Sequence, residues 1–149
     1  MTEHDDAELL AALGQVFERI DPPPEHVIAS ARDVFTWRSL DAELAELVYD
    51  SMAQDATLVR GSDTTREVTF RAPGIEVEVM VVSEHHRSLV GQVVPAQEAG
   101  VELLHRAGTA TTTTDALGRF TFDRVPPGAV KLVVVTASGM RVQTEGLVI

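Results

Sequence analysis

The sequence predicts an α+β protein in which short N-terminal helices precede an antiparallel β-sandwich. Helix-forming Ala, Leu and Glu are concentrated in residues 1–50, whereas most of the valines and threonines follow them. From Ala56 onward, the apolar residues stop recurring every three or four positions and begin to alternate with polar ones. Turn signals also separate several short strand-like segments, at the spacing of about 8–12 residues that is typical of all-β domains.

Two amphipathic helices are expected at the N-terminus. Between residues 3 and 20 the apolar positions recur at the spacing of one helical face; they are Leu9, Leu10, Leu13, Val16, Phe17 and Ile20. The run Asp21-Pro22-Pro23-Pro24 ends this helix, because proline lacks an amide donor and restricts the residue before it. A second helix begins there, with Glu25 near its positive end. Its apolar stripe is Val27, Ile28, Ala31, Val34 and Phe35.

A third helix is expected after Ser39, a candidate N-cap. Its apolar positions are Leu40, Leu44, Leu47 and Val48, and Asp41, Glu43 and Glu46 lie elsewhere on its surface. Residues 1–53 therefore form an acidic helical segment. Short helices with one apolar face are not stable alone and must pack on something.

Residues 54–149 are expected to form the β-sandwich. Alternating or short apolar segments predict strands at residues 68–70, 75–81, 89–94, 101–105, 109–114, 119–122, 129–136 and 140–144. Turn signals separate them at Pro73-Gly74, Gly100, Ala107-Gly108, residues 115–118, residues 126–128 and Ser138-Gly139. The helical segment and the sandwich together define the α+β class.

Composition excludes several functional classes. The formal charge of −11 disfavours direct nucleic-acid binding, which relies on lysine and arginine. The absence of cysteine excludes disulfides, thiol catalysis and cysteine-based metal sites. No apolar run is long enough to span a membrane, and the acidic start, Met1-Thr2-Glu3-His4-Asp5-Asp6, is unlike a secretory signal, so we expect a cytoplasmic protein.

The distribution of charge predicts a basic protein partner. Residues 1–50 hold twelve Asp and Glu against three Arg, a net charge of −9, whereas residues 51–149 hold eleven against nine cations, a net of −2. We therefore expect the helical segment to cover a basic surface of its partner. The predicted partner-binding residues are Phe35, Trp37, Arg38, Asp41, Glu43, Glu46 and Tyr49.

Three alternatives to this interpretation stay open. Tryptophan and arginine are common at interaction hot spots, but Trp37 could instead anchor the helices on the core. The acidic side chains could simply form a solvated face. The helices or the open sheet edges could also pair between copies of the chain and form a homo-oligomer.

No catalytic motif supports an enzyme. The sequence has no Gly-x-Ser-x-Gly, His-Glu-x-x-His, phosphate-binding loop or dinucleotide fingerprint, so we expect no catalytic residues and no cofactor. A metal- or small-ligand-binding sandwich is the alternative, with Glu84, His85, His86 and His105 meeting across a hairpin. The histidine pair is better explained as a solvated turn, because adjacent strand residues face opposite ways.

The C-terminal half resembles the carboxypeptidase regulatory-like domain, a small prealbumin-like (transthyretin-like) sandwich. The likeness covers residues 88–149 and is carried by residues 89–94, 101–103, 114–122 and 125–128. Its most specific part is Thr-Asp-Ala-Leu-Gly-Arg-Phe-Thr-Phe at residues 114–122, followed by Val-Pro-Pro-Gly. Here Asp115 and Gly118 build a tight turn, and Phe120 and Phe122 point to one side of the next strand. The resemblance implies a noncatalytic binding or spacer module.

The whole chain is also similar to small actinobacterial proteins that occur beside extracytoplasmic-function-type sigma factors. Residues 33–51, 58–60 and 89–93 carry this likeness. It implies a sigma factor as the basic partner and an anti-sigma-type or other sigma-factor-associated role in transcription regulation. The His-x-x-x-Cys-x-x-Cys motif of zinc-binding anti-sigma domains is absent, so such a role would use a zinc-free helical segment.

Overall fold

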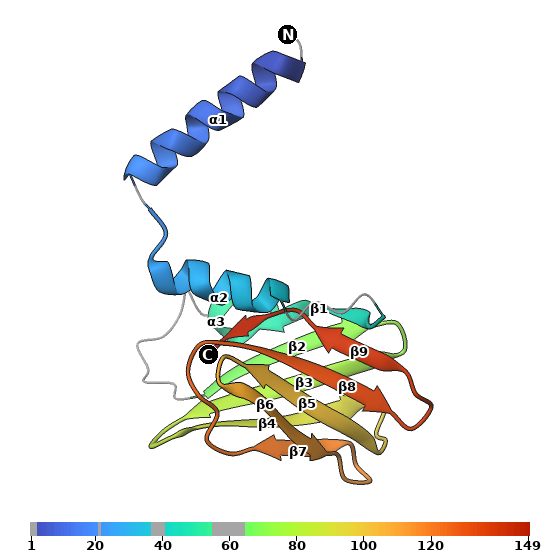
Figure 1. The fold of residues 1–149 in the computed structure, drawn as a ribbon. Helices are drawn as coiled ribbons and strands as arrows, with labels where there is room; N and C mark the ends of the chain where they lie inside the picture. The colour runs from blue at the N-terminus through green and yellow to red at the C-terminus, as the bar shows by residue number, and fades with distance from the viewer. Residues whose placement is uncertain (1–2, 21, 37–40, 55–64) are drawn as a thin grey trace.

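The protein is a curved sheet of β-strands preceded by two helices (Figure 1). The fold is taken from a computed structural model, which describes residues 3–20, 22–36, 41–54 and 65–149. Strands are the most abundant secondary structure in these residues and helices precede them, so the predicted α+β class is confirmed in its general form.

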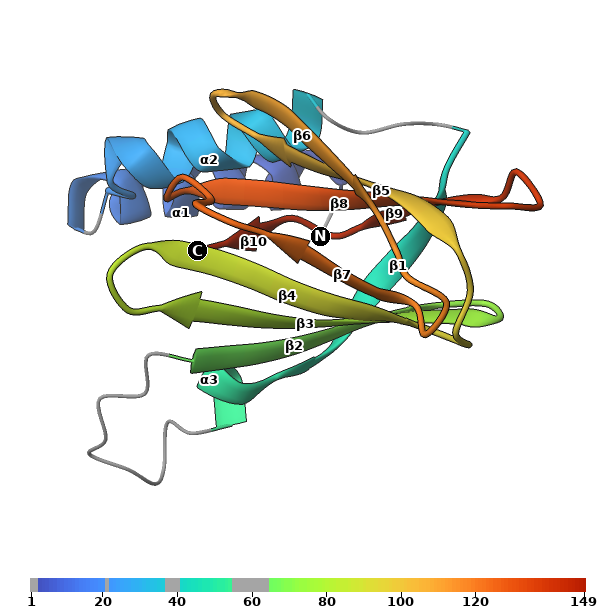
Figure 2. The same cartoon turned by 90° about the horizontal axis from the view of Figure 1, so that it is seen from below.

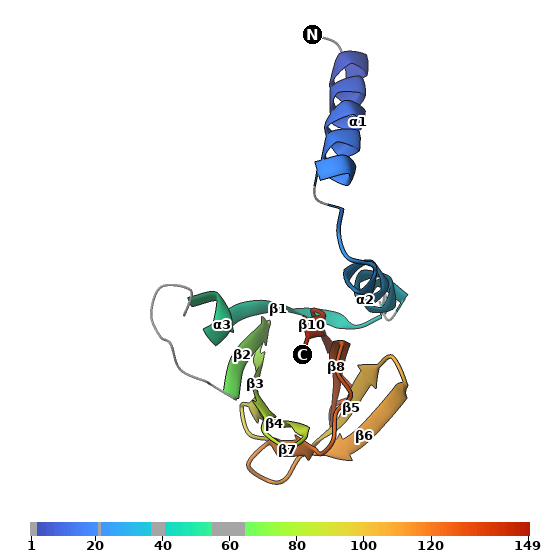
Figure 3. The ribbon, with the colours of Figure 1, turned by 90° about the vertical axis from the view of Figure 1, so that its left-hand side faces the viewer.

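Both predicted N-terminal helices are confirmed. Helix α1 runs over Glu3–Ile20 and α2 over Glu25–Thr36. The carbonyl of Pro24 accepts hydrogen bonds from the amides of Val27 and Ile28, at 2.9 and 3.3 Å, so the proline run ends one helix and begins the next. Figure 3 shows that α1 projects away from the sheet, whereas α2 lies beside it.

The predicted third helix is wrong. Residues Glu43–Asp50 form strand β1, and the one-turn helix α3, Ser51–Gln54, follows it. Strand β1 pairs in parallel with β9 through residues 43–45 and antiparallel with β2 through residues 46–50. The first half of β1 thus has backbone partners on one side and the second half on the other, and this pairing overrides the helix propensity of a short Glu- and Leu-rich run.

The remaining predicted strands are present. They are β2 (Thr65–Ala72), β3 (Ile75–Ser83), β4 (Arg87–Val94), β5 (Ala99–His105), β6 (Gly108–Thr113), β7 (Arg119–Phe122), β8 (Ala129–Thr136) and β9 (Arg141–Thr144). The short β10, Leu147–Val148, was not predicted and pairs with β8. The order along the sheet is β6-β5-β8-β9-β1-β2-β3-β4-β7. Strand β1 therefore links two groups of strands that curve around one interior (Figures 2 and 3).

The inward faces of both groups form one hydrophobic core. Its fully buried side chains include Val68, Phe70, Val77, Leu89, Val93, Val101, Leu103, Val134 and Val142. Phe120 and Phe122 lie on one side of β7, as predicted, and both are buried in this core, with their rings in an edge-to-face arrangement at 6.1 Å. Phe120 lies against Gly91 on β4, where a Cβ atom would be 2.2 Å from the ring. Glycine at this position therefore lets the ring fill the interior.

Candidate interaction surfaces

The predicted partner-binding residues do not form one helical face. Phe35 lies in the last turn of α2 and is 73% exposed. Glu43, Glu46 and Tyr49 are exposed on strand β1, and Asp41 is exposed just before it. The prediction that these residues form the acidic surface of a third helix is therefore wrong. Trp37 and Arg38 lie outside the described residues.

Helix α1 carries an uncovered apolar stripe. Leu9, Leu10, Leu13 and Val16 are 46–68% exposed, and no described element covers them (Figure 1). The helix also holds five Asp and Glu against one Arg, a net charge of −4. Burying a leucine side chain yields about 1.5–3 kcal/mol, so this stripe offers a large gain to whatever covers it.

Helix α2 packs on the sheet through a small contact. Val34 lies over the chain between β9 and β10, where a Cβ atom on Gly146 would be 2.6 Å from the Val34 methyl groups. The buried ammonium of Lys131, on β8, donates a hydrogen bond of 3.4 Å to the carbonyl of Val34. A cation in this position complements the negative end of the helix.

Most of the apolar stripe of α2 stays exposed beside a groove. Val27 and Phe35 are exposed although they belong to the stripe that was expected to pack. Between α2 and β1 lies an open groove of about 640 Å³, lined partly by Phe35, Leu44 and Leu47. The apolar surface of α2 thus continues onto the first half of β1.

A second exposed surface is the outer face of the strand group β1-β2-β3-β4-β7, opposite the core. Tyr49 lies across from Thr69 on β2, and this row continues through Glu78 and Gln92 to Arg119. The neighbouring row is formed by Glu67, Met80 and Val90. These side chains surround a shallow hollow of about 370 Å³.

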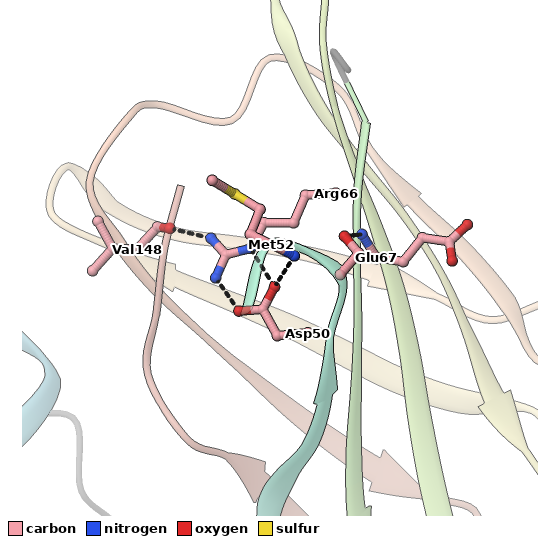
Figure 4. A network of polar contacts seen from close by, with 6 residues as sticks. Asp50, Met52, Arg66, Glu67 and Val148 are labelled. Carbon is pink, nitrogen blue, oxygen red and sulfur yellow. Dashed lines mark hydrogen bonds and ion pairs between the residues drawn. The ribbon is translucent and has the colours of Figure 1, made fainter. Parts of the chain in front are cut away.

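A partly buried ion pair fixes the end of β1 on the side of the sheet opposite this hollow (Figure 4). The guanidinium of Arg66 donates to both carboxylate oxygens of Asp50, at 3.0 and 2.6 Å, and to the carbonyl of Val148 at 2.8 Å. The Asp50 side chain is 12% exposed. Its hydrogen bond to Arg66 lowers the pKa of Asp50 below its ordinary value, although partial burial opposes this effect. The pair ties strands β1 and β2 to the C-terminal β10.

The predicted tight turn at Asp115 is confirmed. Its carboxylate accepts hydrogen bonds of 2.9 Å from the amides of Leu117 and Arg119 and pairs with the Arg119 guanidinium. The hydrogen bond from the Arg119 amide, and to a smaller extent the one from the Arg119 side chain, lower the pKa of Asp115. Gly118 completes the turn with a φ of +76°, in the left-handed region that favours glycine.

The histidines of the alternative metal site lie in exposed or edge positions. His85 and His86 are exposed in the connection between β3 and β4, as the turn interpretation predicts. His105 ends β5 on the other strand group, and its Nδ1 accepts a hydrogen bond of 3.2 Å from Ala107. Within the described residues, no group of three His, Cys, Asp or Glu side chains is arranged to hold a metal ion.

Comparison of the chain with protein-family models, with curated protein sequences and with solved structures finds no match. Among the described residues, neither α1 nor α2 has the length and apolar character that a membrane span requires.

Proposed function

We propose that this protein is a noncatalytic interaction protein that binds a basic protein through its acidic N-terminal segment. The exposed apolar stripe of α1, set among an excess of carboxylates, carries this proposal. A partner segment with apolar residues flanked by Lys and Arg would match both features. Charge disfavours the pairing of α1 with a second copy, because each helix carries a net charge of −4.

The sheet provides the rigid support for the acidic N-terminal segment. We propose that residues 88–149 form a prealbumin-like sandwich of the carboxypeptidase regulatory-like kind. The Asp115 turn and the paired Phe120 and Phe122 support this proposal, because they have the roles that the motif implies. Strand β1 and helix α2 then connect the sandwich to the binding segment.

The proposed partner is a sigma factor, bound in the cytoplasm. This part of the proposal depends on the sequence likeness over residues 33–51, 58–60 and 89–93. The mechanism would be occlusion, in which the acidic segment covers a basic surface that the partner otherwise uses for polymerase or DNA. The net charge of −9 in residues 1–50 supports a basic partner of this kind.

The test compares two double variants of the full chain. Leu9→Ser with Leu13→Ser removes the centre of the stripe, and Ala11→Ser with Gln15→Ser changes the same helix away from it. We expect the wild type and the second variant to retain a basic protein from lysate of the host, and the first variant to lose it. Titration with that purified protein should show at least tenfold weaker binding for the stripe variant, since two leucines contribute more than 1.4 kcal/mol.

Two results would overturn the proposal. One is equal retention of the partner by both double variants. The other is a dimer of the wild type, seen by sedimentation, that the stripe variant abolishes, because α1 would then serve self-association. The urea midpoint should be the same in all three proteins, because the four substituted side chains are exposed in the wild type.

A further inference from the structure

The outer face of the strand group β1-β2-β3-β4-β7 has the properties of a binding surface. Helix α2 packs on β8, on the opposite strand group, so it leaves this face uncovered (Figure 2). Tyr49, Met80 and Val90 are 36–42% exposed there and border the hollow of about 370 Å³. Met80 and Val90 lie side by side on β3 and β4, and Tyr49 lies across β2 from them on the same hollow.

The charges on this face are unbalanced. Among the described residues of this face, the cations are already paired: Arg71 with Glu76 at 2.7 Å, and Arg119 with Asp115 at 2.8 Å. The carboxylates of Glu46, Glu67 and Glu78 have no ion-pair partner among the described residues. Glu67 and Glu78 lie on neighbouring strands beside the apolar patch. The surface therefore combines apolar contact area with unpaired negative charge.

We propose that this face binds a Lys- or Arg-bearing segment of a protein, as a second site separate from α1. Cations of the segment would pair with Glu67 and Glu78, and one of them would lie over the ring of Tyr49. Apolar side chains of the same segment would contact Met80 and Val90. Nucleic acid and a second copy of this chain are disfavoured, because both would bring negative charge to this face.

The test is an NMR titration of the full chain with two synthetic peptides. The probe alternates Lys and Leu over six residues, and the control peptide alternates Glu and Leu. We expect the Lys-Leu peptide to shift the amide resonances of Thr69, Glu78 and Gln92, and the Glu-Leu peptide to leave them unchanged. Because the shifts identify the residues involved, binding at α1 is read separately from binding at this face.

Two double variants with equal changes of net charge, and one variant that leaves the net charge unchanged, make the test specific. Glu67→Gln with Glu78→Gln should weaken binding about fivefold, as expected for the loss of two exposed ion pairs. Tyr49→Leu, which keeps an apolar side chain but removes the aromatic face, should weaken it about threefold. Glu84→Gln with Glu98→Gln removes two exposed carboxylates located elsewhere and should change the dissociation constant less than twofold.

The proposal is refuted if the Lys-Leu peptide shifts α1 resonances but none on β2, β3 and β4. It is also refuted if the two double variants weaken binding equally, because the attraction would then reflect net charge alone. Equal shifts with both peptides would refute the role of the carboxylates.

Discussion

Replacing Gly118 by alanine should destabilise the fold far more than the same change at Gly74. The two glycines have almost the same φ, +76° and +77°, in the left-handed region. They differ in their surroundings. A Cβ atom at Gly118 would lie 2.4 Å from the carbonyl oxygen of Val93, whereas one at Gly74 would have nothing within 4 Å. The pair therefore separates steric exclusion from backbone strain.

The expected magnitudes follow from these contacts. At both sites alanine in the left-handed region costs about 1 kcal/mol. At Gly118 the new methyl group must also displace the backbone of β4, and there the amide of Val93 donates a hydrogen bond of 2.8 Å to the Gly118 carbonyl. Losing such a buried bond costs about 1–3 kcal/mol, so we expect a total of about 3 kcal/mol for Gly118→Ala.

Urea unfolding followed by far-UV circular dichroism measures both variants against the wild type. In thermal unfolding of a chain of this size, a loss of about 3 kcal/mol in unfolding free energy lowers the Tm by about 6–12 °C, and a loss of about 1 kcal/mol lowers it by about 2–4 °C. The slope of the unfolding free energy against urea should stay the same, which shows that the comparison concerns stability. Equal losses at Gly118 and Gly74 would refute the steric argument.

Two further predictions concern the ion pair beside β1 and the packing of Phe120. Asp50→Asn should lower the unfolding free energy by about 2 kcal/mol at neutral pH. Because the folded-state pKa of Asp50 is lowered, the extra stability of the wild type is fully present above the ordinary pKa of aspartate and disappears as the pH falls through the folded-state pKa. A stability difference that does not depend on pH would contradict this prediction. An equal loss from Glu102→Gln, which breaks the more exposed pair of Glu102 with Arg141, would also contradict it. Gly91→Ala should lower the unfolding free energy by about 1–3 kcal/mol, because the new methyl group overlaps the Phe120 ring. Adding Phe120→Leu to this variant should recover part of the loss. If the two substitutions instead lower the urea midpoint additively, the packing argument is wrong.

The sequence predicts those parts of the fold that depend on local patterns. The spacing of Leu9, Leu13 and Val16 is regular over several turns, and the proline run gives α1 a definite end. Residues 75–79 alternate strictly between apolar and acidic side chains, so β3 and its buried face could be predicted. Strand β1 could not, because its eight residues fit a helical and an extended pattern, and distant pairing with β2 and β9 decides between them.

The candidate surfaces could be predicted only in part. Tyr49 and Glu46 are exposed, as a binding role requires, but they were expected on a helix beside Trp37. Their neighbours Glu67 and Glu78 were not predicted as site residues, although the alternation around Glu78 already places it on the solvent side of its strand. Which outward residues meet across strands depends on register, and register is set by pairing between distant segments.

Net charge alone gives a misleading view of residues 51–149. Their formal net charge of −2 indicates a nearly neutral surface. Yet Arg66, Arg71, Arg119 and Arg141 are all engaged in ion pairs with carboxylates of this chain. A paired arginine offers little to an approaching partner, so on the outer face of β1-β2-β3-β4-β7 the carboxylates of Glu46, Glu67 and Glu78 determine the local field. The local excess of carboxylates on this face, more than the net charge of the whole segment, therefore makes it acidic, and this excess supports the proposal that the face binds a basic segment.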